Sequence, residues 1–471
     1  MVRLNSATLP RLPIATPGYD RDGVGTGIAH FGVGNFHRAH QAMYVDRLLR
    51  RGLAREWGIR GLGVLPADRR MRDVLAAQDG LYTLISEHPD GSRDARVIGS
   101  IVDYRYVPDD PAAAVELLAA PATRVITLTI TEGGYRVRDR ASVFGLIVEA
   151  LVRRRDRGIG APTIVSCDNI EHNGEVARCA VVEHVQLLHP GVVGWVDDHV
   201  RFPCSMVDRI TPVTTPGLVA GVERDFGVAD RWPVAAESFA AWVLEDDFAA
   251  GRPPLEEAGV LLVDDVAPYE AMKLRLLNAG HQCLCYFAWL CGYRMVHDAA
   301  RDPLLAEFLC AYFDSEAIPT LAPVPGIDLA AYSRELVERF ANPGVADTVA
   351  RLCAYSSDRI PAWLLPVIRA NLRTGGPVRL ASAAVASWAR YAEAVDEDGE
   401  PIEVVDNLAD SLVPAARSEW ERPGAFLENP AVFGDLPRAP RFAEAYRRAL
   451  DSLHTHGARA TLEGLVKGVR A

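Results

Sequence analysis

The sequence predicts an α/β Rossmann-type N-terminal domain followed by a mainly α-helical C-terminal domain. Apolar strand-like runs alternate with helix-like segments up to about residue 190, a G-x-G turn follows the first run, and the segments after about residue 265 are mostly helical in character. Strands that alternate with helices form βαβ units with a mostly parallel sheet. A chain of 471 residues is long enough for more than one domain, and we expect residues 1–262 and 263–471 to form them.

The first half contains strand-like and helix-like segments in turn. RVITLTIT (124–131) is rich in β-branched residues, as buried strands are. The segment 142–158 has helical periodicity and basic residues in its last turn, which suits the helix dipole. The expected strands are 27–31, 59–65, 124–131 and 162–169, and the expected helices are about 38–51, 70–78, 142–158 and 174–188.

The composition excludes several classes of partner. A net charge of −12 disfavours binding to nucleic acid or to an anionic membrane. The N-terminus is interrupted by prolines and lacks the apolar core of a signal peptide. We therefore expect a cytoplasmic protein without transmembrane helices, acting on a small molecule as a monomer or small homo-oligomer. The eight cysteines are too few for a disulfide framework, and without clustered ligand motifs no metal site is expected.

The segment FGVGNFHRAH (31–40) is a candidate nucleotide-binding turn. Gly32 and Gly34 at a strand-to-helix turn allow a tight bend and close approach to a pyrophosphate, but without a third glycine the motif is equally compatible with a plain βα turn. Asp68 follows the second strand, where an acid binds the adenosine ribose and favours NAD over NADP. Arg69 and Arg70 could instead hold a 2′-phosphate, and Asp68 could also be a helix N-cap.

The run KLRLLNAGH (273–281) places three polar side chains in an otherwise apolar helix. At 100° per residue, His281 lies about 80° and Asn278 about 140° from Lys273, so all three share roughly one side. Taken singly, they read as a snorkelling lysine, an interior amide and a core histidine. Taken together, they either point into solvent or line a cleft that needs a base and hydrogen-bonding groups.

Several motifs in one order resemble the polyol-specific long-chain dehydrogenases, the family typified by mannitol 2-dehydrogenase. They are GVGNFHRAHQAMYVDRLL, TITEGGY, SCDNIEHNG, FPCSMVDRITP, WVLEDDF, YEAMKLRLLNAGH, SDRIPAWLLP and VFGDL. The resemblance runs from about residue 25 to at least residue 440. It implies an enzyme with its active site between the two domains, which interconverts a sugar alcohol and a ketose with NAD and without a metal.

The resemblance also implies roles for individual residues. Lys273 would be the general base, Asn169 and Asn278 would hold the reacting oxygen, and His281 would position substrate hydroxyls. The other implied contacts are to substrate from Asp208, Arg351 and Arg359, and to cofactor from Gly32, Gly34, Asn35, Phe36 and Asp68. The family often has lysine where Arg359 stands. Asp208 could instead pair with Arg209, and Glu132 and Glu270 could be either site or capping carboxylates.

The chemistry agrees with a lysine base. Without a metal to acidify the alcohol, a side chain must take its proton as hydride leaves. Lysine has an ordinary pKa of about 10.4, so desolvation must lower the pKa for Lys273 to act at neutral pH. Two asparagine NH₂ groups are suitable donors to the oxygen as charge develops there.

The expected activity is NAD-dependent oxidation of a polyol, with D-mannitol and D-fructose as the first candidate pair. D-Arabinitol or sorbitol dehydrogenation is an alternative. Reduction of fructuronate or tagaturonate is another, because Arg351 and Arg359 could bind a carboxylate in a bidentate manner. A catalytically silent nucleotide-binding regulator is the alternative outside enzymology, and the complete set of Lys273, Asn278, His281 and Asn169 argues against it.

Overall fold

The computed structural model describes residues 2–470, which form two units. The first comprises the residues up to His88 and from Ser92 to Ala267, and the second comprises Pro89–Gly91 and the residues from Pro268 onwards. No helix among residues 2–470 has both the length and the apolar character needed to cross a membrane.

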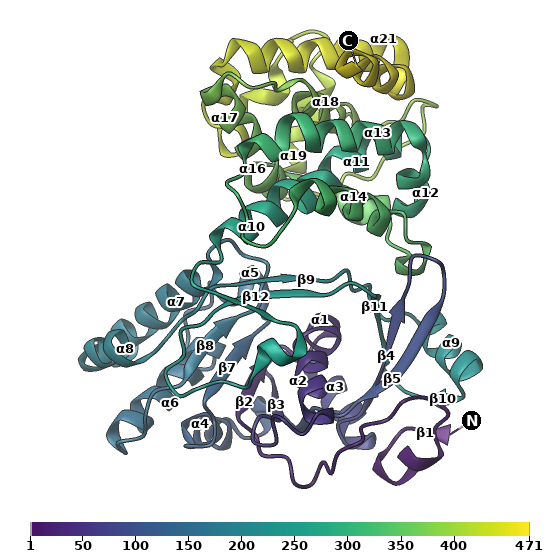
Figure 1. The fold of residues 1–471 in the computed structure, drawn as a ribbon. Helices are drawn as coiled ribbons and strands as arrows, with labels where there is room; N and C mark the ends of the chain where they lie inside the picture. Colours follow the sequence, from purple (N-terminus) through teal and green to yellow (C-terminus); the bar gives the residue numbers. More distant parts are fainter. Residues whose placement is uncertain (1, 471) are drawn as a thin grey trace. The chain divides into compact units, whose positions relative to one another are not determined.

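The first unit is built on a five-stranded parallel sheet with the order β6-β3-β2-β7-β8 (Figure 1). Its strands are β2 (Ile28–Phe31), β3 (Ile59–Gly63), β6 (Ile101–Tyr106), β7 (Val125–Leu128) and β8 (Thr163–Ser166). The order runs outward in both directions from β2 and β7, so the sheet has a topological switch point between these two strands. In such sheets a ligand binds at the carboxyl ends of the strands next to that point.

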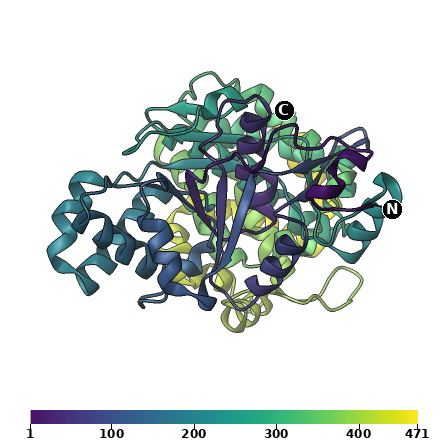
Figure 2. The ribbon, with the colours of Figure 1, turned by 90° about the horizontal axis from the view of Figure 1, so that it is seen from below.

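Both faces of this sheet are buried. Along β2, Ile28 packs into one apolar cluster and Ala29 into another, and Val125 and Ile126 of β7 divide in the same way. This explains why the strands read as continuous apolar runs. The surrounding helices are α1 (Asn35–Ala39), α2 (Gln41–Arg50), α3 (Asp68–Ala77), α4 (Pro111–Ala119), α6 (Val143–Asp156), α7 (Asn173–Leu188) and α8 (Val193–His199). Figure 2 shows α6 to α8, in blue to teal, gathered to one side of the strands.

Smaller sheets complete the first unit. The three-stranded sheet β11-β4-β5 contains the hairpin of β4 (Tyr82–Glu87) and β5 (Arg93–Ile98), and another has the order β13-β12-β9. The strands of these sheets were not among those predicted from the sequence. The remaining elements are β1 (Val2–Arg3), α5 (Thr131–Gly134), β9 (Ser205–Asp208), α9 (Pro216–Phe226), β10 (Val228–Ala229), β11 (Val234–Glu237), β12 (Ala241–Glu245) and β13 (Leu261–Val263).

The second unit is helical. Its first helix, α10 (Ala267–Lys273), is followed by a π-helical turn (Leu274–Asn278) and then by α11 (Ala279–Leu290). The later helices are α12 (Val296–Arg301), α13 (Pro303–Tyr312), α14 (Leu329–Phe340), α15 (Val349–Cys353), α16 (Ser356–Trp363), α17 (Leu365–Thr374), α18 (Arg379–Ala392), α19 (Ala409–Arg417), α20 (Pro430–Phe433) and α21 (Pro440–Arg470), which is kinked at Gly457. The predicted fold class, a Rossmann-type domain followed by a helical one, is confirmed.

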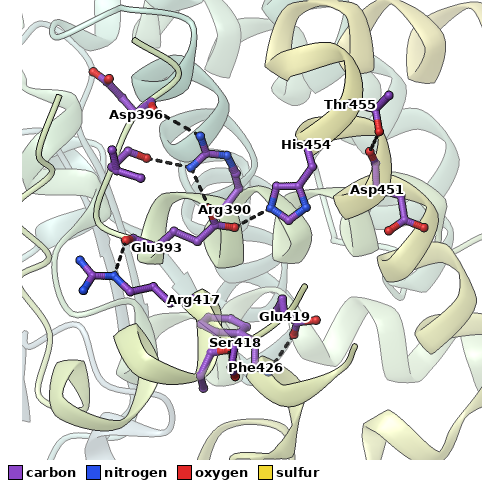
Figure 3. Close-up of polar contacts among 12 residues, drawn as sticks. Arg390, Glu393, Asp396, Arg417, Ser418, Glu419, Phe426, Asp451, His454 and Thr455 are labelled. Atoms are coloured by element: carbon purple, nitrogen blue, oxygen red, sulfur yellow. Dashed lines mark hydrogen bonds and ion pairs between the residues drawn. The ribbon is translucent and has the colours of Figure 1, made fainter. Parts of the chain in front are cut away.

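A polar cluster joins three of these helices (Figure 3). The carboxylate of Glu393, just after α18, pairs with His454 of α21 at 2.6 Å and with Arg390 at 3.2 Å. Arg417 of α19 donates to the Glu393 carbonyl oxygen at 2.9 Å. These contacts fix the end of α18 against α19 and α21.

Candidate active site

The predicted glycine turn lies at the switch point of the parallel sheet. Gly32 follows β2 with φ +92°, and the Thr129 hydroxyl, just after β7, donates to its carbonyl oxygen at 2.7 Å. A Cβ atom at position 32 would lie 2.0 Å from the Thr129 carbonyl oxygen, so only glycine fits there. The backbone at Gly32 therefore lies close to the edge of the sheet and carries no side chain, as close contact with a pyrophosphate requires.

The residues after the glycines are engaged within the protein. The Asn35 amide donates to the Pro212 carbonyl at 3.0 Å and to the Thr214 hydroxyl at 3.1 Å, and its oxygen accepts from Arg38 at 2.8 Å. Phe36 stacks on His40 with ring centroids 4.9 Å apart. The predicted helix over 38–51 is two helices, because the backbone breaks at His40 between α1 and α2.

Asp68 braces the turn after β3. One carboxylate oxygen accepts the N–H groups of Val64 and Leu65 at 2.9 and 2.8 Å. Asp68 is the first residue of α3 and Ala67 is its N-cap, so the alternative of an N-cap at Asp68 was wrong. Arg69 and Arg70 are exposed and line a pocket of about 570 Å³ together with Arg231 and Trp232.

Asn169 and Asp208 stand at the ends of two strands in the first unit. Asn169 is exposed three residues after β8, and Asp208 is the buried last residue of β9. The guanidinium of Arg209 donates to the backbone carbonyls of Ala39 and, at 2.8–2.9 Å, Glu237, which gives this arginine a structural role. Glu132 is exposed in the short helix α5.

In the second unit, Lys273, Asn278 and His281 are all buried, with 6–8% of their surface exposed. The expectation of a regular α-helix through them was wrong, because a π-helical turn separates Lys273 from Asn278. In this turn Ala279 N–H donates to the Leu274 carbonyl five residues earlier. A spacing of five residues is therefore about one turn here, which brings Asn278 closer to the face of Lys273 than the 140° expected for an α-helix.

Packing around this turn fixes the side chains. His281 stacks on Phe340 of α14 at 4.1 Å, and a Cβ at Gly280 would lie 2.9 Å from the Phe313 ring. Within the described residues, the side-chain oxygen of Asn278 has no hydrogen-bond partner although it is buried. Such an atom is costly unless a ligand satisfies it. π turns of this kind occur frequently at functional sites.

Several buried polar residues of the second unit were not predicted from the sequence. Arg339 and Asn342, in and after α14, are 4% and 3% exposed and lie beside Phe340 in the chain. Glu270, for which the sequence left two roles open, is also buried. No sequence motif marks Arg339, because the stacking of its neighbour Phe340 on His281 is seen only in the structure.

The two predicted substrate arginines have protein partners. Arg351 forms a bidentate ion pair with Asp347, with 2.6 Å between its Nε and the carboxylate. Arg359 donates to the carbonyls of Arg351 and Leu352 at 3.0 and 3.1 Å. These contacts close the C-terminal end of α15 and occupy the face of Arg351 that would receive a carboxylate. Across the part of the chain that the structure describes, no three His, Cys, Asp or Glu side chains are grouped as metal ligands.

Comparison with known proteins agrees with this architecture. Residues 26–257 match the mannitol dehydrogenase Rossmann domain, and residues 265–454 match the mannitol dehydrogenase C-terminal domain. A mannitol 2-dehydrogenase of Cereibacter sphaeroides is 40% identical, over 95% of this chain and 98% of that one.

Solved structures give the same result. The mannitol 2-dehydrogenase of Pseudomonas fluorescens, a ternary complex with NAD and D-mannitol, is 40% identical with a TM-score of 0.89, over 99% of this chain and 100% of that one. A substrate-free D-sorbitol dehydrogenase is 34% identical with a TM-score of 0.92, over 98% and 100%. The resemblance inferred from the motifs is confirmed, and the chain belongs to the mannitol dehydrogenase family.

Proposed function

We propose that this chain, an NAD-dependent polyol dehydrogenase, interconverts D-mannitol and D-fructose with Lys273 as the general base and without a metal ion. The observation that carries the proposal is the buried π turn, which sets Lys273 and Asn278 one turn apart and is followed by His281. The similarity to mannitol 2-dehydrogenases over nearly the whole chain supports the choice of substrate.

The first unit fits the cofactor. The glycine turn leaves no space for a side chain at Gly32, and Gly34 is exposed just before α1, as a pyrophosphate contact requires. Asp68 keeps a second carboxylate oxygen for the adenosine ribose while its first one braces the turn. When bound, NAD supplies the acceptor for the hydride that leaves C2 of mannitol.

The second unit supplies the proton acceptor of the proposed reaction. In its neutral form Lys273 takes the proton of the C2 hydroxyl, and its burial favours that form. The amides of Asn278 and Asn169 hold the oxygen as it gains charge. The His281 ring, fixed by Phe340, orients neighbouring hydroxyls of the polyol. Asp208, buried at the end of β9, accepts a further substrate hydroxyl.

Sorbitol is the second candidate substrate, supported by the similarity to D-sorbitol dehydrogenase. D-Mannitol and D-sorbitol differ only in configuration at C2, and oxidation there gives D-fructose from both. Uronate reduction has less support, because Asp347 already occupies the guanidinium of Arg351. A catalytically silent nucleotide-binding regulator also has less support, because it would not need the buried lysine and the buried amide of Lys273 and Asn278.

Initial rates on a panel of substrates test the proposal. Mannitol, sorbitol and arabinitol with NAD, and fructose and fructuronate with NADH, are compared before and after dialysis against EDTA. We expect the highest kcat/KM on mannitol and fructose, and no loss on dialysis. Preference for another polyol would reject the substrate, and loss restored by a divalent metal would reject the metal-free mechanism.

Lys273→Met tests the base. We expect the Kd of NADH to stay within a factor of about 2 of the original value. Turnover should fall by about 10³-fold or more, because the variant loses both the general base and the contacts by which it orients the substrate. Arg373→Met, at the C-terminal end of α17, is the matched loss of a cation and should change neither quantity. Turnover that survives in Lys273→Met would exclude the lysine as base.

A further inference from the structure

A buried carboxylate holds the backbone next to the predicted site residue Asn169. Asp168 is 8% exposed, and its oxygens accept the N–H of Thr131 at 2.8 Å, the N–H of Ile130 at 3.1 Å and the hydroxyl of Tyr135 at 2.7 Å. Burial raises the pKa of the Asp168 carboxyl. The chain thus keeps a desolvated acid here to tie the segment after β7 to the segment after β8.

The segment after β7 has a backbone conformation that needs this support. Thr131 has φ +59°, in the left-handed region, which is strained for a residue with a Cβ atom. Thr129, two residues earlier, donates to the carbonyl of Gly32. Through Thr129 and Thr131, the contacts of Asp168 therefore reach the glycine turn at the switch point.

A second side chain fixes Asn169 from the other direction. The Asn173 amide donates to the Asp168 carbonyl at 3.1 Å and to the Ser205 carbonyl at 2.7 Å, and its oxygen accepts the Ser205 N–H at 2.9 Å. Ser205 begins β9, the strand that ends at Asp208. The backbone at Asp168 and Asn169 is thus held between β7 on one side and β9 on the other.

We infer that Asp168 and Tyr135 are positioning residues of the reaction, which hold Asn169 and the loop after β7 in the arrangement that hydride transfer requires. The inference rests on the proposed function, since Asn169 is the residue that they position. Tyr135 contributes through its hydroxyl, which lies 2.7 Å from Asp168 and 2.6 Å from the Ser166 hydroxyl. Neither residue exchanges a proton with the substrate.

The first unit contains a matched pair that serves as a control. Asp46 of α2 is 1% exposed and accepts the hydroxyl of Tyr19 at 2.6 Å and the N–H of Gly99 at 2.9 Å. It also pairs with Arg50 at 2.6 Å. Gly99 precedes β6, so this pair lies toward the amino ends of the parallel strands, away from the edge that carries Asn169.

Four variants separate positioning from stability: Asp168→Asn and Tyr135→Phe at the site, and Asp46→Asn and Tyr19→Phe as controls. For each full-length variant we would measure Tm, the Kd of NADH by fluorescence, kcat with fructose per NADH-binding site, and the primary isotope effect with NADH deuterated at C4. Tyr135→Phe removes one hydroxyl only, so it remains informative if Asp168→Asn does not fold.

We expect kcat per site to fall about 10- to 100-fold in Asp168→Asn and about 3- to 10-fold in Tyr135→Phe, with a larger isotope effect, because misplacement slows the chemical step itself. The controls should lose Tm but keep kcat within a factor of about 2. Site variants that lose only Tm, like the controls, would overturn the inference while leaving the proposed function intact. An original chain that bound no NADH, or reduced no ketose, would instead overturn both.

Discussion

A Cβ atom on Gly32 would lie 2.0 Å from the carbonyl oxygen of Thr129, so the chain after β2 and the chain after its neighbour β7 meet at a point where only glycine fits. The backbone of Gly32 also has φ +92°. Close approach and backbone conformation therefore impose the same residue, at the position where a dinucleotide would contact the sheet edge.

Gly32→Ala should abolish NADH binding at concentrations that saturate the original chain, because the turn must move to relieve the contact. The measurement is NADH fluorescence titration. Gly52→Ala is the control, since Gly52 has φ +73° but a Cβ added there would meet no atom within 4 Å. It should cost about 1 kcal/mol of stability through its backbone conformation alone. Equal NADH affinity in the two variants would contradict this account of the turn.

The acid stability of the first unit should depend on His30. This side chain is fully buried, contacts the Thr127 hydroxyl at 2.7 Å and stacks on His37 at 3.4 Å. Burial lowers the pKa of His30 from 6.5 to about 3. The folded state holds the neutral ring, so its contribution, about 5 kcal/mol, is complete above pH 6.5 and is lost as the pH falls from 6.5 toward 3.

Replacing His30 with Asn should make the free energy of unfolding less dependent on pH. Between pH 6 and 4 the slope should fall by about 1.4 kcal/mol per pH unit, the value for one proton taken up on unfolding. Urea unfolding at several pH values measures it. His199→Asn, at an exposed position on α8, is the control and should keep the original slope. An unchanged slope in His30→Asn would mean that other groups dominate acid unfolding.

Four strands of the parallel sheet could be predicted because they are largely buried and read as apolar runs between helices with clear ends. Ser142, for example, caps α6 by accepting the N–H of Gly145 at 3.1 Å. The fifth, β6, was missed because IVDYRY is polar and only partly buried in its middle. The hairpin β4–β5 was missed because β5, RDARVI, is polar along half its length. RVITLTIT was predicted too long, since the chain turns at Thr129 to reach Gly32.

The candidate site was predictable only as far as residue types. The motif singles out Lys273, Asn278 and His281 as candidates, but a π turn leaves no signature in periodicity, so the angle expected between Lys273 and Asn278 was wrong. Arg351 was expected to be available for a substrate carboxylate, because its ion pair with Asp347, four residues earlier, is identified only by the structure. Asp168, next to Asn169, was not predicted as a site residue. The sequence does not distinguish a buried carboxylate that binds backbone N–H groups from an exposed carboxylate in a loop.

Asp68 should control the choice between NAD and NADP. Its carboxylate stands before Arg69 and Arg70, which with Arg231 line a cationic pocket. Asp68→Asn keeps an acceptor for the N–H groups of the turn but removes the charge that repels a 2′-phosphate. We expect the ratio of kcat/KM for NADH to that for NADPH to fall by about 10-fold, which corresponds to the loss of about 1.4 kcal/mol of charge repulsion.

Asp109→Asn is the control for loss of charge alone. It removes a carboxylate that pairs at 2.7 Å with Arg72, which lies in α3, the helix that Asp68 begins. It should leave the cofactor ratio unchanged. A ratio that is equal in the two variants would show that the exposed arginines, and not Asp68, determine cofactor choice.

The cluster around Glu393 should stabilise the second unit without affecting turnover (Figure 3). His454 and Glu393 have only 7% and 13% of their side-chain surface exposed, and the imidazole also stacks against Trp420 at 4.6 Å. His454→Leu leaves the Glu393 carboxylate without one of its donors, which should cost about 1–3 kcal/mol of unfolding free energy. Lys467→Leu, at the exposed pair with Glu463 (3.7 Å), should cost less than about 0.5 kcal/mol. Urea unfolding and kcat with fructose are measured for both variants. A fall in kcat per NADH-binding site in His454→Leu would show that this cluster affects the active site as well as holding α18, α19 and α21 together.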